Sequence, residues 1–244
     1  MGHLKGRLVL VVDDEPDLRE MLVSELENAQ TKTLEAKNGR EALQIVKNEK
    51  IDLVISDIRM PGGNGIEFLD GAKSLNLKKP VFIFITAFAD ITKEEIYAHG
   101  AEGLITKPFD LPNLLELLEW LSTPPIERYA LKPKIEAPKH IKLSQHQNNS
   151  TEIIMGRGGA LLHTGKEIHE AGSYVHFHIT FSNTKELAGI GEVLWNGCAN
   201  NMGEYCAGVE FRYFTDETRD FGIEILEQST SKEYVPERKE KLDI

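Results

Sequence analysis

The chain has 244 residues, of which 41% are hydrophobic and 27% charged, and its formal net charge is −11. This length allows two domains that each bury a core, and the composition is that of a soluble globular protein. No stretch approaches the roughly 18 consecutive apolar residues that a membrane span needs. The acidic balance also argues against non-specific nucleic-acid binding, which depends on basic surface.

The N-terminal apolar run and the cysteines indicate where the protein resides. The run at 8–12 leads into three acids without a small-residue cleavage site, so a buried strand is expected there rather than a signal peptide. Cys198 and Cys206 are too few for a disulfide framework, although a hairpin turn between them could bring them face to face. We therefore expect a cytoplasmic protein with free thiols.

The first half of the chain alternates short apolar runs with helical patterns. Continuous apolar runs at 8–12, 53–56 and 81–85 are typical of parallel strands covered on both faces. Weaker strands are expected near Thr33 and Ile105, and leucines recur at helical spacing between the strands and at 111–121. The pattern predicts a doubly wound, five-stranded parallel α/β domain over residues 1–122.

The second half has a different periodicity. Four of the ten prolines lie between Ser122 and His140, which predicts a semi-rigid linker over 123–139. Residues 175–181 then alternate apolar and polar side chains, as a half-buried antiparallel strand does. Similar runs follow and precede it, and they predict a small antiparallel β-barrel over 140–230. These runs are Ile141–Leu143, Ala160–Leu162, Gly191–Trp195 and Ala207–Tyr213.

The end of the chain is predicted to form a helix that closes the barrel, followed by a tail. Residues 215–226 fit a closing helix, and residues 231–244 are strongly charged. We expect the latter to form a solvated or frayed C-terminal tail.

Carboxylates follow two of the predicted parallel strands. Asp13 and Asp14 come directly after the first strand, and Asp57 ends the run at 53–56. In an open parallel sheet, ligands bind at these strand ends, where the strand order reverses. Three converging carboxylates repel one another, and a divalent cation with oxygen ligands such as Mg²⁺ is the natural counter-ion. Thr86 and Lys107 end two further strands and would complete a site for a phosphoryl group.

The order and spacing of five motifs make this half resemble a response-regulator receiver domain, which is CheY-like and of flavodoxin-like fold. The alternative is a generic doubly wound domain whose acids cap helices. The matching motifs are Asp13-Asp14, Asp57 followed by Met60-Pro61-Gly62, Gly65, Thr86-Ala87 and Lys107-Pro108-Phe109.

The resemblance implies a role for each of these residues. Asp57 would be the phosphoacceptor, and a sensor histidine kinase or phosphotransfer protein would be the donor. Mg²⁺ would be held by Asp14, the Asp57 carboxylate and the backbone carbonyl of Arg59, with Asp13 acting through water. Lys107, before a cis proline, would pair with the phosphoryl oxygens.

The resemblance also implies a switch, from which this sequence departs. Thr86 would move toward the phosphoryl group and report phosphorylation. The family usually has an aromatic residue three positions before the lysine, where this chain has Leu104. We therefore do not assume that a movement of Thr86 reaches the outer face of the domain through the family's aromatic residue.

The second half resembles a PilZ domain. The segments that carry this resemblance are Met155–Leu162, Gly189–Trp195 and Tyr205–Phe211. The last two are similar to the family's glycine-valine-tryptophan and glycine-valine-glutamate-phenylalanine strands.

The segments with which PilZ domains bind cyclic di-GMP are largely missing. Where the family has an acid, a serine and a glycine in the pattern [D/N]xSxxG, this chain has Ile154, Gly156 and Gly159. Its closest match to the family's RxxxR runs from Arg128 to Lys132, and lysine lacks the planar fork of arginine.

Two readings of the basic residues remain open. Arg128, Lys132 and Arg157 are candidates for a divergent cyclic di-GMP site. We favour the alternative, in which these charges are solvated and the domain is a protein-interaction module.

The second half contains several histidines and Trp195. His176 and His178 share a strand face and could bind a metal with His163 or His169, but no carboxylate or cysteine stands at supporting spacing. We expect surface histidines, and a packing role for Trp195.

Taken together, these features predict a two-component response regulator that acts as a signalling switch. An effector that also binds cyclic di-GMP is the alternative. Residues 123–244 show no separate nucleophile–base set, so enzymatic activity is expected only as the receiver's own phosphoryl transfer and autodephosphorylation. No helix-turn-helix pattern predicts DNA binding, and no membrane insertion is expected. The downstream protein partner is not identified, and a homodimer is a further option.

Overall fold

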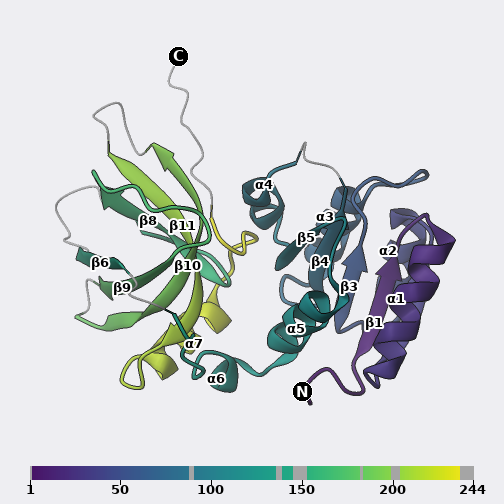
Figure 1. Cartoon of the computed structure of the whole chain (residues 1–244), viewed down its shortest axis with the longest axis horizontal. Coiled ribbons are helices and arrows are strands. Elements are labelled where there is room, and N and C mark those ends of the chain that lie inside the picture. The colour runs from purple at the N-terminus through teal and green to yellow at the C-terminus, as the bar shows by residue number, and fades with distance from the viewer. Residues whose placement is uncertain are drawn as a thin grey trace. The chain divides into compact units, whose positions relative to one another are not determined.

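A computed structural model describes residues 2–87, 91–135, 139–144, 153–181, 184–198 and 204–236. Contacts divide the chain into two units (Figure 1). The first contains residues 1–92 and 99–124, and the second contains residues 125–244 together with helix α4 (Lys93–Ala98).

The first unit contains a five-stranded parallel sheet in the order β2-β1-β3-β4-β5. The strand order reverses between β1 and β3, whose carboxyl ends lie next to each other. This sheet confirms the predicted doubly wound domain. Its strands are β1 (Leu8–Val12), β2 (Lys32–Ala36), β3 (Leu53–Ser56), β4 (Val81–Thr86) and β5 (Gly103–Thr106).

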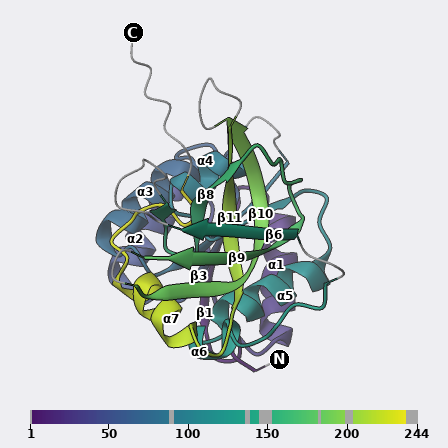
Figure 2. The ribbon, with the colours of Figure 1, turned by 90° about the vertical axis from the view of Figure 1, so that its left-hand side faces the viewer.

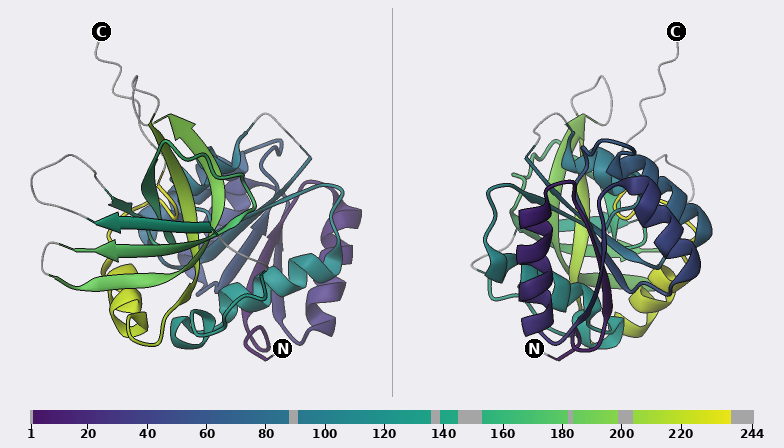
Figure 3. Two further views of the ribbon diagram at one scale, coloured as in Figure 1. Left: turned by 60° about the vertical axis from the view of Figure 1, so that its left-hand side comes forward. Right: turned by 90° about the vertical axis from the view of Figure 1, so that its right-hand side faces the viewer.

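Helices flank both faces of this sheet (Figure 3). Apolar side chains of α1 and α5 pack with Val9, Ile55 and Ile83 in one core cluster. Neighbouring strand residues point to the other face, where Phe82 stacks edge-on against Phe68 of α3. The helices are α1 (Pro16–Asn28), α2 (Gly39–Asn48), α3 (Gly65–Leu75) and α5 (Leu111–Ser122).

Charged side chains also form contacts within the first unit at a distance from the carboxyl ends of the strands. The buried Lys73 ammonium lies 2.7 Å from the Glu102 carboxylate, and the other oxygen of Glu102 accepts the N–H of Phe82. On α5, the Glu119 carboxylate accepts the N–H groups of residues 2–4. The Glu119 side chain thus holds the N-terminal segment against α5.

The second unit contains a curled six-stranded sheet in the order β6-β9-β10-β11-β8-β7 (Figure 2). All neighbouring pairs are antiparallel except β6 and β9, which are parallel. The curled sheet is compatible with the predicted barrel and encloses a core that includes Phe177, Phe211 and Phe214. The strands are β6 (Lys139–Ser144), β7 (Ile154–Met155), β8 (Gly159–Gly165), β9 (Tyr174–Thr180), β10 (Glu186–Cys198) and β11 (Tyr205–Phe214).

The start of the predicted linker is part of the second unit, which corrects that expectation. Residues Pro125–Arg128 form the short helix α6, and the next residue, Tyr129, is buried. Its ring lies 4.8 Å from that of Phe214, and its carbonyl accepts the N–H of the same residue. The proline-rich composition concealed one aromatic anchor of the core.

The C-terminal residues also differ from the expected frayed tail. Helix α7 (Arg219–Gln228) follows the sheet close to the predicted closing helix. Beyond it, Tyr234, Val235 and Pro236 are buried. The charged composition of 231–244 therefore misled the prediction for residues 234–236, which pack against the second unit, while residues 237–244 lie outside the described part.

The cysteines do not face each other in the strand register. Cys206 pairs with Gly197, whereas Cys198 pairs with Tyr205. Cys206 is buried as a free thiol, and the side chain of Cys198 lies outside the described residues. Among the helices described, none combines the length and apolar character that crossing a lipid bilayer requires.

Candidate functional site

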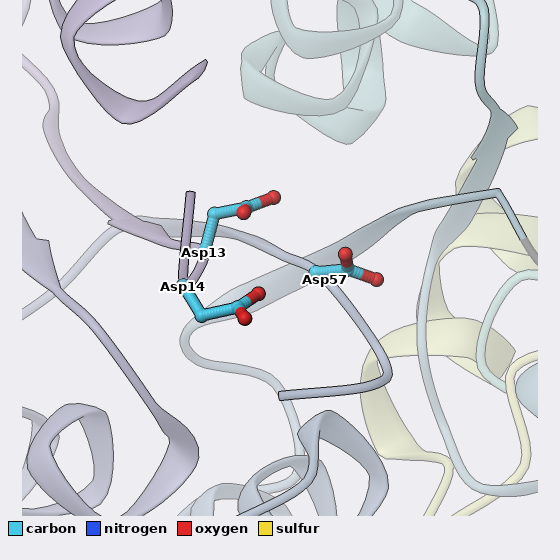
Figure 4. Close-up of side chains that lie close together, drawn as sticks. All are labelled: Asp13, Asp14 and Asp57. Carbon is cyan, nitrogen blue, oxygen red and sulfur yellow. The ribbon is translucent and has the colours of Figure 1, made fainter. Parts of the chain in front are cut away.

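The carboxyl ends of β1 and β3 bring three carboxylates together. Asp13 and Asp14 follow β1 and Asp57 follows β3, and the three lie side by side in Figure 4. One oxygen from each lies within 4.8 Å of the others. Asp13 and Asp57 are buried, and Asp14 is exposed. The predicted cluster is therefore formed, and it opens to solvent on the side of Asp14.

Backbone groups fix the orientation of the Asp57 carboxylate. Its Oδ1 accepts the N–H of Ile58 at 2.6 Å and that of Arg59 at 3.4 Å. The Asp57 N–H in turn donates to the carbonyl of Val12 in the neighbouring strand. Asp57 is only 6% exposed, so little of its carboxylate meets solvent.

Lys107 follows β5 and reaches across the strand ends to the acids. Its Nζ lies 3.0 Å from Asp13 Oδ2, 3.1 Å from Asp57 Oδ2 and 3.6 Å from Glu15 Oε1. The peptide bond between Lys107 and Pro108 is cis, as predicted. Glu15 is an acid that the sequence interpretation left without a role, although it extends the run Asp13-Asp14.

Burial and charge act in opposite directions in this pocket. Burial raises the pKa of Asp13, although the N–H of Glu15 and the ammonium of Lys107 oppose that rise. Burial alone would lower the pKa of Lys107, but its hydrogen bonds to Asp13 and Asp57 raise it above the ordinary value. Lys107 therefore stays protonated at neutral pH and supplies one positive charge to a cluster of acids.

The remaining predicted residues surround this pocket. Thr86 ends β4 with a fully buried side chain, and its carbonyl accepts the N–H of Lys107. Arg59 is exposed beside Asp57. Leu104 is half-buried in β5, where its backbone pairs with Phe84. The roles of these side chains in a phosphoryl switch stay predictions.

Glycines allow the loop after Asp57 to fold back beneath the pocket. Gly62 has a φ of +85°, a left-handed conformation that side chains other than glycine rarely adopt. A Cβ atom at Gly65 would overlap the carbonyl oxygen of Asp57 and lie 2.8 Å from the Phe84 ring. The Gly65 N–H donates to the carbonyl of Ile58, which closes the loop.

The donor set of the pocket fits a hard divalent cation. Asp13, Asp14 and Asp57 are the one group of histidine, cysteine or acidic side chains, within the described parts of the chain, with the spacing of metal ligands. All three offer carboxylate oxygens, the ligands that Mg²⁺ prefers. The pocket holds one ammonium, that of Lys107, against the four carboxylates of Asp13, Asp14, Glu15 and Asp57, and this net negative charge also needs such a counter-ion. The acidic pocket is thus consistent with Mg²⁺ binding.

In the second unit, the candidates for a cyclic di-GMP site have other contacts. The Arg157 guanidinium donates to the carbonyl of Lys232 and lies 5.8 Å from the centre of the Tyr234 ring. The Arg128 guanidinium lies 5.7 Å from the Tyr129 ring, and Lys132 is exposed. Arg157 is partly exposed and bonds the carbonyl of a residue distant in sequence, and its role as a solvated charge or as a ligand residue stays a prediction.

The histidines and Trp195 are placed as follows. His178 lies 3.2 Å from the Glu186 carboxylate on the neighbouring strand, and His169 is buried. In the described residues these histidines are not part of a metal-ligand group. The Trp195 indole is 7% exposed and lies against Gly208, where a Cβ would overlap it, which confirms the predicted packing role.

One buried charged cluster of the second unit was not anticipated. Arg212 on β11 lies 2.9 Å from the buried Glu210 carboxylate and 2.7 Å from that of Glu192 on β10. Burial raises the pKa of Glu210, and Arg212 opposes this rise. The only signal in the sequence is a pair of opposite charges inside an apolar strand, at positions 210 and 212.

Comparison with known proteins identifies the first unit. Residues 9–119 match the family of response regulator receiver domains. Response regulator protein PilR of Pseudomonas aeruginosa is 36% identical over 110 residues, which cover 45% of this chain and 24% of that protein. The phosphate regulon transcriptional regulatory protein PhoB of the same organism is 34% identical over 116 residues, which cover 47% of this chain and 51% of that protein.

Solved structures match the same part of the chain. The structure of chemotaxis response regulator CheY4 of Vibrio cholerae is 32% identical, and the match covers 48% of this chain and 99% of that one with a TM-score of 0.45. The chain spans only about a quarter to a half of the length of PilR and PhoB. The residues that match the family carry the acidic pocket described above, and residues 9–119 are therefore a response regulator receiver domain.

Proposed function

We propose that the protein is a two-component signalling switch that takes up a phosphoryl group on Asp57. The observation that carries this proposal is the position of the Lys107 ammonium, 3.1 Å from Asp57 Oδ2 and 3.0 Å from Asp13 Oδ2 at the mouth of an acidic pocket. A pocket of acids with one fixed cation suits a phosphoryl group, whose oxygens need positive charge on several sides.

The transfer step forms one bond and breaks another. An Asp57 carboxylate oxygen attacks the phosphorus of a phosphohistidine on a sensor kinase or phosphotransfer protein. The P–N bond breaks as the O–P bond forms, and the imidazole nitrogen keeps the electron pair. The backbone N–H groups of Ile58 and Arg59 orient the attacking carboxylate, and Lys107 would then pair with the new phosphoryl oxygens. Hydrolysis of the acyl phosphate by water returns the free carboxylate.

A bound Mg²⁺ would supply charge neutralisation at the phosphoryl oxygens. Asp14, the Asp57 carboxylate and the carbonyl of Arg59 would hold it, with Asp13 acting through water. Asp14 is the exposed member of the cluster, so the ion would enter from that side.

Readout inside the receiver would begin at Thr86. Its side chain is fully buried at the end of β4, the neighbour of β3, which Asp57 directly follows. Movement of Thr86 toward the phosphoryl group would open space in the interior. Because Leu104 replaces the usual aromatic residue, the change would reach the surface through an aliphatic side chain.

We propose that residues 140–230, with the anchor at Tyr129, form a PilZ-like output domain that binds a protein partner. The curled sheet supports this proposal, together with the glycine-rich turn at 156–159 and the Gly208–Phe211 strand. Contacts of Arg157 with residues 232 and 234 weigh against cyclic di-GMP binding, which we keep as the alternative. We propose no DNA-binding output, because the net charge is −11, and no catalysis beyond the phosphoryl transfer and its hydrolysis.

Phosphoryl uptake from acetyl phosphate tests the proposed function without a cognate kinase. Intact-mass spectrometry should detect one phosphoryl group on the wild type in the presence of Mg²⁺. The variant Asp57→Asn should take up none, and Asp52→Asn, which removes an acid at the opposite end of β3, should behave as the wild type. Equal uptake by Asp57→Asn and the wild type would refute the assignment.

A further inference from the structure

Residues 232–236 lie along the glycine-rich turn at 156–159 in the second unit. The Arg157 N–H donates to the Glu233 carbonyl at 3.1 Å, and the Gly158 N–H donates to the Tyr234 carbonyl at 2.8 Å. The Arg157 side chain adds two bonds to the Lys232 carbonyl, from Nε at 3.4 Å and Nη2 at 3.3 Å. Every one of these bonds ends on a main-chain oxygen of a segment that bends at residues 232, 234 and 235, so the turn holds this segment by its backbone.

The glycines of the turn are shaped to this segment. A Cβ atom at Gly158 would overlap the ring of Tyr234, and one at Gly156 would overlap the Tyr234 carbonyl oxygen. At Gly159, a Cβ would lie 2.8 Å from Cγ2 of Val235. Gly156 and Gly158 therefore form a groove that any side chain would fill, and the groove accommodates the aromatic ring of Tyr234. At Gly159, the carbonyl oxygen of Val209 on β11 already excludes a side chain.

The Tyr234 side chain has a polar environment at the end of this groove. It is 3% exposed, and the Arg157 guanidinium lies 5.8 Å from its ring centre. Burial, followed by the charge of the nearby Glu210 carboxylate, raises its pKa well above the ordinary value. The tyrosine therefore stays neutral at neutral pH, and its ring packs against that of Tyr97 with the centroids 5.5 Å apart.

We propose that this groove is a peptide-binding site and that residues 232–236 are its internal occupant. Main-chain bonds would supply affinity, and the contacts of the tyrosine and the valine would supply specificity. The external ligand would be a peptide of a partner protein in which a tyrosine is followed by an aliphatic residue. This inference deepens the interaction role proposed for the second unit and does not depend on phosphoryl transfer.

The internal segment would control access to the groove. A segment tethered by a short connection from α7 competes at an effective concentration on the order of millimolar. A segment whose own affinity for the groove is micromolar would therefore weaken the binding of a partner peptide by a factor on the order of a thousand until the segment leaves. Removing the Tyr234 ring should weaken the internal occupant and leave the groove itself intact.

The test uses the full chain and a fluorescent peptide that copies residues 229–236. Fluorescence anisotropy should show peptide binding to Tyr234→Ala at least tenfold tighter than to the wild type. Glu217→Ala, which removes an exposed acid between β11 and α7, should match the wild type. The double variant Gly158→Ala with Tyr234→Ala should lose binding, as should a peptide with alanine in place of the tyrosine.

Hydrogen exchange at the Arg157 and Gly158 amides supplies a second readout. These amides should lose protection in Tyr234→Ala and regain it when the peptide is added. Folded Tyr234→Ala that binds no peptide would overturn the proposal, as would equal binding by Tyr234→Ala and the wild type. Global unfolding of Tyr234→Ala would show that the segment is part of the core, and it would overturn the proposal as well. Phosphoryl uptake by the receiver, measured on the same samples, separates failure here from failure of the proposed switch.

Discussion

Replacing Asp14 by asparagine should stabilise the metal-free protein. The substitution removes one of three carboxylates whose oxygens lie within 4.8 Å of one another. Asp14 is exposed, so the dielectric constant of water applies, and each repulsion at that distance is worth roughly 0.9 kcal/mol. Lys107 offsets part of the charge of Asp13 and Asp57. The expected gain is therefore about 1 kcal/mol, or roughly 4 °C in melting temperature.

Differential scanning calorimetry with and without Mg²⁺ measures both effects of this substitution. The wild type should gain stability as Mg²⁺ is added, by about 2.7 kcal/mol at a hundredfold excess over the dissociation constant. Asp14→Asn should start higher and lose most of this gain. Asp17→Asn is the matched control, since it removes an exposed acid from the first turn of α1, where the helix dipole favours negative charge. The reasoning fails if Asp14→Asn melts lower than the wild type without metal, or if it keeps the full Mg²⁺ response.

Three further substitutions test the rest of the structure. Lys73→Met removes the ammonium that lies beside the buried Glu102 carboxylate, and it should lower the free energy of unfolding in urea by about 3–5 kcal/mol. The control Lys79→Met breaks the more exposed pair with Asp52 and should lower it by under about 1 kcal/mol. Burial alone would raise the pKa of Glu119, but three N–H donors lower it overall. The stability that Glu119 contributes is therefore complete above its unfolded pKa of about 4.3 and is lost as the pH falls through its lower folded pKa. The melting temperatures of the wild type and Glu119→Gln should converge below about pH 4, and a difference that stays constant with pH would contradict this. Tyr129→Ala should destabilise the second unit by about 3 kcal/mol in a urea titration followed by tryptophan fluorescence, and a linker-like effect near zero would argue against its place in the core.

Much of the first unit could be predicted because its strands are short, continuous apolar runs. The boundaries of β1 and β3 agree with the predicted runs at 8–12 and 53–56. Acids directly after such strands must meet at one edge of a parallel sheet, so the cluster of Asp13, Asp14 and Asp57 follows from the chain order. The contact of Glu15 with Lys107 does not follow, because it depends on the rotamers of two long side chains.

The second unit was less predictable because composition and packing disagree there. A proline-rich stretch hides the buried Tyr129, and a charged stretch hides Tyr234. Each is a single aromatic residue that packs against a distant part of the chain, and such contacts leave no periodic signal in the local sequence. The pair Glu210 and Arg212 was missed for a related reason, since buried ion pairs in strands depend on the partner strand, here through Glu192.

Location of the phosphoryl group on the protein tests the central claim most directly. The full chain would be treated with acetyl phosphate and Mg²⁺, the acyl phosphate trapped by reduction with borohydride, and the modified peptide sequenced by tandem mass spectrometry. We expect a single modified residue, Asp57, whose carboxylate lies 3.1 Å from the Lys107 ammonium. Modification at Asp13 or Asp14 instead, or an unmodified Asp57 in folded protein, would contradict the assignment of this pocket as a phosphoacceptor site.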